Sequence, residues 1–238
     1  MTIMGTIKYI IGDENLGYLD YFRSSTWDRN WVGPFNGQKG RCQLFSALCS
    51  RFRFEFLVET GTFRGVTTEY IASLTKVPVI TIESNLRNYG FARARLRNFR
   101  RVQLYKGDSV EILQMLFDKQ ILPERLGFYY LDAHWDERLP LRQEMSLIFM
   151  KRPFSIVMAD DFQVPDDPGY FYDNYGNEGA LKIDYISETI LQYRLFPFFP
   201  SCPSNAETGK RRGTIVLTTA ALVEELRQVV ELRELPED

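Results

Sequence analysis

The sequence has few of the residues that build covalently or metal-stapled folds. Its 238 residues include three cysteines and one histidine, and the cysteines form no C-x-x-C pair. An odd, unclustered set of cysteines argues against a disulfide framework or a structural zinc site and indicates reduced thiols. The formal net charge is −2, so no global basic field attracts nucleic acid or an anionic membrane.

Long apolar runs are also missing. No segment approaches the roughly 20 apolar residues that a membrane-spanning helix needs, and the first residues lack the basic stretch and apolar segment of an export signal. We therefore expect a cytoplasmic protein with no membrane and no nucleic-acid partner, and we leave a homo-oligomer open. The length suits one domain, 1–238, with a sizeable core.

Short apolar runs alternate with amphipathic segments through most of the chain. This alternation predicts a parallel sheet with helices on both faces. We expect an α/β, Rossmann-like, doubly wound sheet of seven strands, mainly parallel, with a C-terminal antiparallel hairpin. The predicted strands are 54–60, 77–84, 102–108, 126–134, 154–162, 195–203 and 213–219. The predicted helices are 66–74, 86–99, 109–120, 139–151 and 182–194.

The segments outside the predicted 54–219 core have other compositions. Residues 1–50 are expected to form a helical or irregular cap, irregular over 1–40 and helical over 43–52. The stretch 163–180 is rich in Gly, Pro, Asp and Tyr, and its length indicates a lid or binding loop. Its aromatic residues either stack on a ligand or pack the loop onto the domain. The tail, 220–238, is predicted to be a charged amphipathic helix.

The stretch FLVETGTFRGVTTEYIA, 56–72, has the pattern of a strand, a tight turn and a helix. The dinucleotide fingerprint G-x-G-x-x-G centred on Gly61 requires glycine at 59 and 64, where this chain has Glu59 and Arg64. The G-K-[ST] of a P-loop is also missing. An acid in this turn suits a ligand with an amino group and a positive centre. Alternatively, Gly61 and Gly65 serve only to make a tight turn.

Acids also end the next two predicted strands. Glu83, followed by Ser84, can accept hydrogen bonds from a ribose diol. Asp108, followed by Ser109, can accept from an adenine amine. The alternatives are structural: Glu83 is then a neighbour of a helix N-cap, and Asp108 caps the helix that follows it.

Acids at three consecutive strand ends and a glycine-containing first turn resemble the class I S-adenosylmethionine-dependent methyltransferases. The resemblance covers roughly 54–219. It implies a methionine part near the first turn, a ribose at the second strand end and an adenine at the third. The implied S-adenosyl-L-methionine residues are Glu59, Thr60, Gly61, Gly65, Glu83, Ser84, Asp108, Ser109 and Asp132.

A second group of acids follows the fourth and fifth predicted strands, in YYLDAHW and VMADDF. Neighbouring parallel strands would bring Asp132, Asp160 and Asp161 together. Three carboxylates at one place are costly unless a cation such as Mg²⁺ neutralises them. The arrangement resembles the metal-dependent O-methyltransferases of the catechol and macrocin or mycinamicin types. The resemblance implies a metal at these three acids and a small-molecule hydroxyl acceptor.

His134 stands where the sugar-modifying enzymes of that group usually have an Asp-Gly-Asp-like run. We expect Asp132 and His134 to be catalytic, with His134 as the base for the acceptor hydroxyl. A structural histidine is the alternative. So is a metal-free site in which Asp132 contacts cofactor or substrate while Asp160 and Asp161 cap the next segment. Two other functions stay open: a hydroxylase-like enzyme on this scaffold, similar to the cephalosporin-hydroxylase-like proteins, and a non-catalytic ligand-binding domain.

Overall fold

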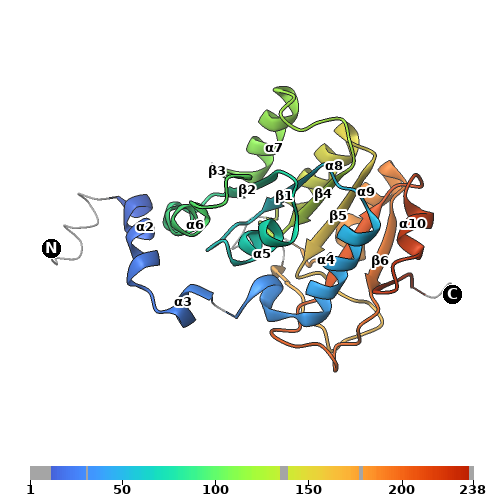
Figure 1. The fold of residues 1–238 in the computed structure, drawn as a ribbon. Helices are drawn as coiled ribbons and strands as arrows, with labels where there is room; N and C mark the ends of the chain where they lie inside the picture. Colours follow the sequence, from blue (N-terminus) through green and yellow to red (C-terminus); the bar gives the residue numbers. More distant parts are fainter. Residues whose placement is uncertain (1–11, 31, 135–138, 177–178, 236–238) are drawn as a thin grey trace.

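The seven predicted strands and one further strand form one sheet, in the order β3-β2-β1-β4-β5-β7-β6-β8 (Figure 1). The computed structural model describes residues 12–30, 32–134, 139–176 and 179–235. The parallel strands are β1 (Phe56–Thr60), β2 (Val79–Glu83), β3 (Val102–Lys106), β4 (Gly127–Leu131) and β5 (Ser155–Asp160). The antiparallel strands are β6 (Phe196–Pro200), β7 (Thr214–Thr218) and β8 (Leu232–Arg233). This confirms the predicted fold class, with one strand more than expected.

Alternate residues of each strand enter two separate cores, because side chains in a strand point to opposite faces in turn. Val58 of β1 belongs to the core under α7, α8 and α9, whereas Leu57 belongs to the core under α4, α5 and α10. The helices of the first face are α7 (Ser109–Asp118), α8 (Leu141–Lys151) and α9 (Ile183–Tyr193). Those of the second are α4 (Lys39–Arg51), α5 (Val66–Leu74) and α10 (Val223–Arg227). The face to which a strand residue points therefore decides which acids can meet at the strand ends.

The N-terminal region is more regular than predicted. Helices α2 (Asp13–Arg23) and α3 (Thr26–Asn30) occupy a stretch expected to be irregular, and α2 packs on α6 (Leu86–Leu96). Two glycines allow the close approach. A Cβ on Gly17 would lie 1.9 Å from the Arg87 carbonyl oxygen, and a Cβ on Gly90 would lie 1.8 Å from that of Glu14. The prediction missed α2 because tertiary packing, not local pattern, stabilises it.

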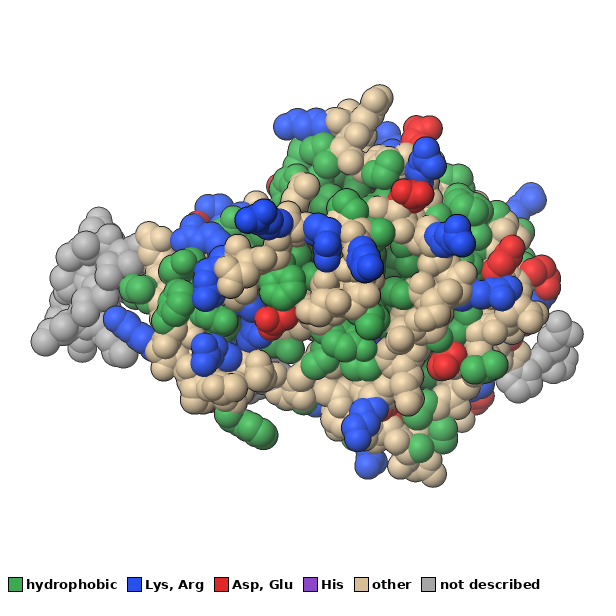
Figure 2. Space-filling view, viewed as in Figure 1, with side chains coloured by type: hydrophobic (Ala, Val, Ile, Leu, Met, Phe, Trp, Pro, Cys, Tyr) green, Lys and Arg blue, Asp and Glu red, His purple; other side chains and the backbone are tan. Residues whose placement is uncertain are grey.

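The arginines around α6 make much of this helix contact. Lys and Arg side chains gather over the α2 and α6 side of the molecule (Figure 2). Arg87 pairs with Asp20 at 2.7 Å, and Arg93 pairs with Glu14 at 2.5 Å and lies over the Tyr18 ring. Several of these charges therefore hold one helix to the other.

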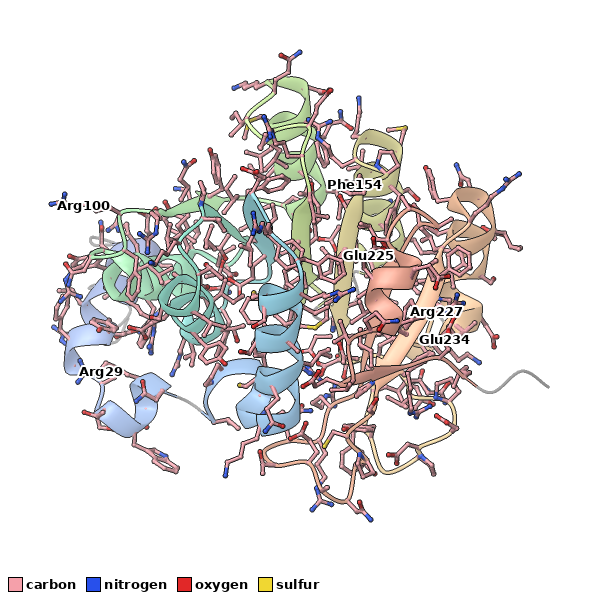
Figure 3. The ribbon with its side chains drawn as sticks, turned by 45° about the vertical axis from the view of Figure 1, so that its right-hand side comes forward. Arg29, Arg100, Phe154, Glu225, Arg227 and Glu234 are labelled. Atoms are coloured by element: carbon pink, nitrogen blue, oxygen red, sulfur yellow. The ribbon has the colours of Figure 1, made fainter. Side chains whose placement is uncertain are left out.

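The tail prediction is wrong for the described residues. In place of one long helix, the five-residue α10 is followed by β8, which pairs with β6. Arg227 of α10 and Glu234 lie side by side and form an ion pair at 2.9 Å (Figure 3). Pairing with an open sheet edge outweighs the local helical pattern here. Residues 236–238 lie outside the described residues. Within the described ranges, no helix has the length and apolar character needed to cross a bilayer.

Candidate active site

The turn between β1 and α5 packs tightly against the ends of two neighbouring strands. Gly61 has φ +81° and Gly65 has φ +74°. The backbone N–H groups of Gly61 and Thr62 donate to the Ile82 carbonyl at 3.0 and 3.1 Å. A Cβ on Gly61 would lie 2.1 Å from the Asp132 carbonyl oxygen. Both the positive φ and the contact with the end of β4 therefore require glycine at 61.

Glu59 lies beneath this turn and is fully buried. The hydroxyls of Thr68 and Thr81 donate to its Oε2 atom, the latter at 2.6 Å. Burial raises its pKa to about 8, although the two hydroxyls oppose the shift. Its carboxyl group thus links β1 to α5 and β2, and it faces protein groups in this structure.

Glu83, at the end of β2, holds the turn from the other side. Its Oε2 accepts from the Phe63 backbone N–H at 2.6 Å and its Oε1 from that of Asn85 at 2.7 Å. Phe63 has φ +50°, a conformation uncommon for a bulky residue. Burial raises the pKa of Glu83, while N–H groups of Asn85, Phe63 and the exposed Ser84 favour its charged form.

Asp108 has the capping role that was one of its two expected roles. Its Oδ1 accepts from the backbone N–H groups of Val110 and Glu111 at 3.0 and 3.1 Å. Ser109, the first residue of α7, is buried. The end of β3 lies beside the end of β2, and β1 lies on the other side of β2.

Three side chains converge after β4 and β5: Asp132, His134 and Asp161. One ligand atom of each lies within 4.8 Å of the others. His134 Nε2 is 3.8 Å from Asp132 Oδ1 and 3.7 Å from Asp161 Oδ2. His134 is 4% exposed, and within the described ranges its Nε2 has no hydrogen-bond partner. Burial lowers the His134 pKa, but the two carboxylates raise it more.

Asp160 is not part of this convergence. Its carboxylate forms an ion pair with Arg41 of α4 and accepts from the Tyr130 hydroxyl at 2.5 Å. The Asn36 amide donates to it at 3.1 Å. Asp160 follows Met158 on the face covered by α4, and Asp161 lies past the strand end with φ +52°. The group that the structure brings together is thus two carboxylates and an imidazole, Asp132, Asp161 and His134. Asp160, the third acid of the set predicted from sequence, is paired with Arg41 instead.

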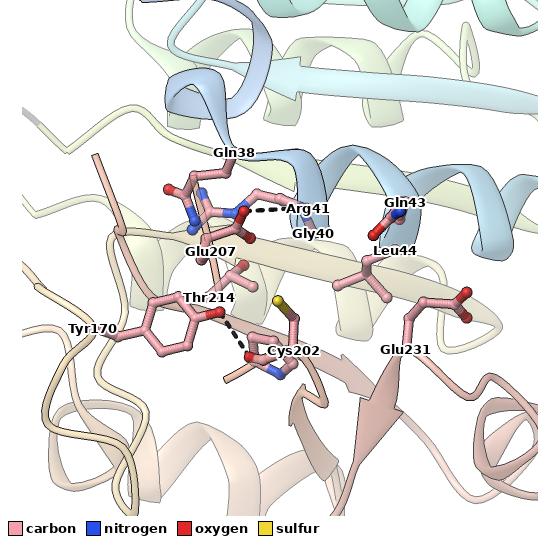
Figure 4. A pocket seen from close by; sticks show the side chains of 11 residues that line it. Gln38, Gly40, Arg41, Gln43, Leu44, Tyr170, Cys202, Glu207, Thr214 and Glu231 are labelled. Carbon is pink, nitrogen blue, oxygen red and sulfur yellow. Dashed lines mark hydrogen bonds between the residues drawn. The ribbon is translucent and has the colours of Figure 1, made fainter. Parts of the chain in front are cut away.

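Arg41 lies beside a small pocket that α4 shares with later segments (Figure 4). There the Gly40 backbone N–H donates to Glu207 at 2.9 Å, and the hydroxyl of the buried Tyr170 donates to the Cys202 carbonyl at 2.8 Å. Tyr170 therefore packs the 163–176 part of the loop onto the core, which was one of the two expected roles of the aromatic residues.

Asp161 is held by Arg212, whose Nε donates to it at 2.6 Å. The same guanidinium pairs with Asp173. Burial raises the Asp161 pKa, but His134 and Arg212 outweigh it and hold that pKa well below its usual range. The Tyr175 hydroxyl lies 2.6 Å from Asp173 Oδ2 and 3.3 Å from the His134 carbonyl oxygen. The 163–176 part of the loop thus reaches the site.

Sequence reasoning missed Arg41, Tyr130, Arg212 and Asp173. A signal existed for Arg41: it precedes Leu44 and Leu48 by three and seven residues, so it shares their buried helix face. A charged residue at such a position indicates a buried partner. No local pattern identifies the other three.

No family model matches the sequence, and no curated protein matches it. Solved structures do match the fold. An O-methyltransferase from Bacillus cereus in complex with SAH has a TM-score of 0.56 at 15% identity, over 90% of this chain and 96% of that one. The O-methyltransferase TomG from Streptomyces achromogenes, in complex with SAM, has a TM-score of 0.52 at 18% identity, over 76% and 80%. A putative O-methyltransferase from Klebsiella pneumoniae has 0.51 at 17%, over 90% and 94%. The fold of this chain is therefore that of the class I S-adenosylmethionine-dependent methyltransferases.

Proposed function

We propose that the protein transfers the methyl group of S-adenosylmethionine to a hydroxyl group of a small-molecule acceptor. The observation that carries the proposal is the convergence of Asp132, His134 and Asp161. They lie at the sheet edge where Gly61 packs against the end of β4. Ligands of open α/β sheets bind at the carboxyl ends of the strands. A cofactor bound across the carboxyl ends of β3, β2 and β1 would direct its sulfonium methyl group toward this cluster.

Glu83 is the proposed ribose contact. A carboxylate has about four lone-pair directions, and the N–H groups of Phe63, Asn85 and Ser84 use three of them. A ribose hydroxyl can therefore share Glu83 without breaking the turn. The buried Glu59 supports the turn from below, and Ser109 and Asp108 border the proposed adenine position.

The cluster fits a divalent metal, because the unpartnered, buried Nε2 of His134 faces two carboxylates. An imidazole in the set favours a transition metal, such as Fe²⁺ or Zn²⁺, over the Mg²⁺ expected from sequence. When bound, the metal would supply a Lewis acid that lowers the pKa of the acceptor hydroxyl. The chain's own residues orient the acceptor: Arg212 fixes Asp161, and Asp173 and Tyr175 border the same side.

The test is a calorimetric titration of the protein with S-adenosylhomocysteine, with and without Mn²⁺ or Mg²⁺. Glu83→Ala should weaken binding at least about tenfold, the effect of losing a hydrogen bond to a charged group. Glu111→Ala removes an exposed carboxylate of α7 and serves as the control with unchanged affinity. No binding by the wild-type protein at millimolar ligand would overturn the proposal.

The nitrogen donor also favours a second candidate, a metal-dependent hydroxylase-like enzyme on the same scaffold, since imidazole and carboxylate ligands suit iron. Mass spectrometry of products separates the two, because methyl transfer adds a CH₂ unit and hydroxylation adds an oxygen atom.

Turnover measured with and without metal distinguishes the two roles proposed for His134, a metal ligand or the base. Turnover without metal, lost in His134→Gln, would make it the base that accepts the hydroxyl proton.

A further inference from the structure

Gln38, the residue before α4, is buried and forms two hydrogen bonds with the backbone of one residue of the site. It is 1% exposed. Its side-chain amide accepts from the Arg212 N–H at 2.8 Å and donates to the Arg212 carbonyl at 2.9 Å. Gln38 and Arg41 lie together at the start of α4 (Figure 4), and the Arg41 guanidinium donates to the same carbonyl. One primary amide thus satisfies both backbone groups of Arg212, as a neighbouring strand would.

The loop that reaches the site holds the same backbone from the other side. The Phe171 N–H donates to the Arg211 carbonyl at 2.9 Å, and the Gly213 N–H donates to the Phe171 carbonyl at 2.8 Å. Arg212 therefore lies between the Gln38 side chain and the Phe171 backbone, and its own side chain starts from a fixed point.

The Arg212 guanidinium extends from this point to Asp161. Its Nε donates to Asp161 Oδ1 at 2.6 Å, and the same guanidinium pairs with Asp173. The other carboxylate oxygen, Oδ2, lies 3.7 Å from His134 Nε2. Because a carboxylate is planar and rigid, the bond at Oδ1 decides the direction in which Oδ2 faces.

Residues with left-handed backbone conformations gather around this contact. Phe35 has φ +48°, Asn36 +60°, Arg211 +49° and Asp161 +52°. Such conformations are uncommon outside glycine and persist where the surrounding contacts hold them, often at functional sites. The Lys210 N–H donates to the Asn36 carbonyl at 3.0 Å, so the segment before α4 and the segment before β7 hold each other in place.

We propose that Gln38 is a positioning residue for the reaction: through Arg212 it directs the carboxylate of Asp161 toward His134. This inference rests on the proposed function, since it takes the cluster of Asp132, His134 and Asp161 as the reaction centre. Because the two hydrogen bonds of the Gln38 side chain go to Arg212, its loss should leave the turns after β1, β2 and β3 in place.

The unique imidazole of this chain reports on the cluster. His134 is the only histidine, so protein carrying isotope-labelled histidine gives one set of ring signals by NMR. The signals are compared at one fixed pH, without metal, in wild type, Gln38→Met, Arg212→Met and the double variant. Gln38→Met should displace them in the same direction as Arg212→Met and by most of its size. In the Arg212→Met background it should add nothing, because the guanidinium through which it acts is already gone.

Thr218→Val is the matched control. Thr218 is buried in β7, and its hydroxyl donates at 2.9 Å to the carbonyl of Ser155, at the end of β5 opposite Asp161. Each buried hydrogen bond lost should lower the folding equilibrium constant about fivefold in urea unfolding, in this control as in Gln38→Met. Thr218→Val should nevertheless leave the imidazole signals unchanged. The stability loss of Gln38→Met should persist in Arg212→Met, since the backbone groups that it leaves unpaired are still there.

Titration with S-adenosylhomocysteine separates this inference from the proposed function. Gln38→Met should bind the ligand within about twofold of wild type, as expected for sites that do not interact. Wild-type protein that does not bind it removes the proposed function and the reaction that Gln38 would serve. With binding intact, unchanged imidazole signals in Gln38→Met, an equal displacement in Thr218→Val, or a further displacement in the double variant overturns the role of Gln38 alone.

A second variant covers the case in which Gln38→Met does not unfold cooperatively. Gln38→Asn keeps the amide on a shorter side chain that cannot reach both backbone groups of Arg212. Displaced imidazole signals in that variant support the positioning role, and unchanged signals overturn it.

Discussion

Asp160 and Asp161, the adjacent acids at the end of β5, contact different sets of side chains. Asp160 is enclosed by Arg41, Tyr130 and Asn36, and its Oδ1 also accepts from the Asp161 backbone N–H at 2.7 Å. Asp161 lies past the strand end with a positive φ and faces His134. The buried Asp160–Arg41 ion pair therefore anchors the residue next to the carboxylate that faces His134.

Replacement of Arg41 with Met should destabilise the protein by about 3–5 kcal/mol, because it leaves Asp160 buried and unpaired. The double variant Arg41→Met/Asp160→Asn should recover part of that loss. Urea denaturation measures the free energies of unfolding. The control is Arg93→Gln, which breaks the partly exposed pair with Glu14 and should cost no more than about 1 kcal/mol. A double variant no more stable than Arg41→Met would contradict the pairing.

The buried Glu59 predicts a pH dependence of stability. Its pKa is raised from 4.5 to about 8 in the folded protein, so the folded state keeps a proton that the unfolded state has released in this window. Stability contributed by this group should therefore be highest below pH 4.5 and decline as pH rises towards 8. Glu59→Gln should flatten the decline. Unfolding free energies measured across this range would show parallel profiles if the assignment were wrong.

Among the secondary-structure elements, α2 packs on a partner far away in sequence, α6. It meets α6 through two glycines whose hydrogen atoms face the other backbone. Its helix has no side-chain N-cap hydrogen bond, so the local sequence stabilises it weakly. Ion pairs between α2 and α6 lie at the rim of this contact.

The α2–α6 contact predicts that a glycine-to-alanine substitution in α6 destabilises the protein, the opposite of its usual effect in a helix. Glycine to alanine in a helix interior normally stabilises by about 0.5–1 kcal/mol. Gly90→Ala should instead destabilise by about 1–3 kcal/mol, because the new Cβ would overlap the Glu14 carbonyl and force the helices apart. Urea unfolding gives the sign, and protease sensitivity of 12–30 should increase with it. A stabilised Gly90→Ala variant would show that α2 does not dock this closely.

At the scale of the whole molecule, the proposed site draws on ends of strands spread across one sheet. A ligand bound to the turns after β1, β2, β4 and β5 would stabilise all of these turns against unfolding. Any ligand that binds only the folded state adds to its stability.

S-adenosylhomocysteine at a free concentration 100 times its dissociation constant should raise the unfolding free energy by about 2.7 kcal/mol. Thermal unfolding with and without the ligand measures the gain. In Glu83→Ala, with the affinity about tenfold weaker, the same concentration should raise the unfolding free energy by only about 1.4 kcal/mol, because the gain depends on the logarithm of the ligand concentration relative to the dissociation constant. An equal shift in both proteins would place the ligand elsewhere.

The sequence by itself determined the elements of the core and the edge of the sheet at which the acids lie. Apolar runs and helical periodicity are local, and parallel strands bring their carboxyl ends together whatever the side chains do. Only the tertiary structure decided which acids share a site. Asn36 and Asp160 are 124 residues apart in the chain, and no local pattern encodes the pairs of Asp160 with Arg41 or Asp161 with Arg212. Docking of α2 on α6 and of β8 on β6 was likewise set by surfaces formed elsewhere in the chain, since neither element is stable without its partner.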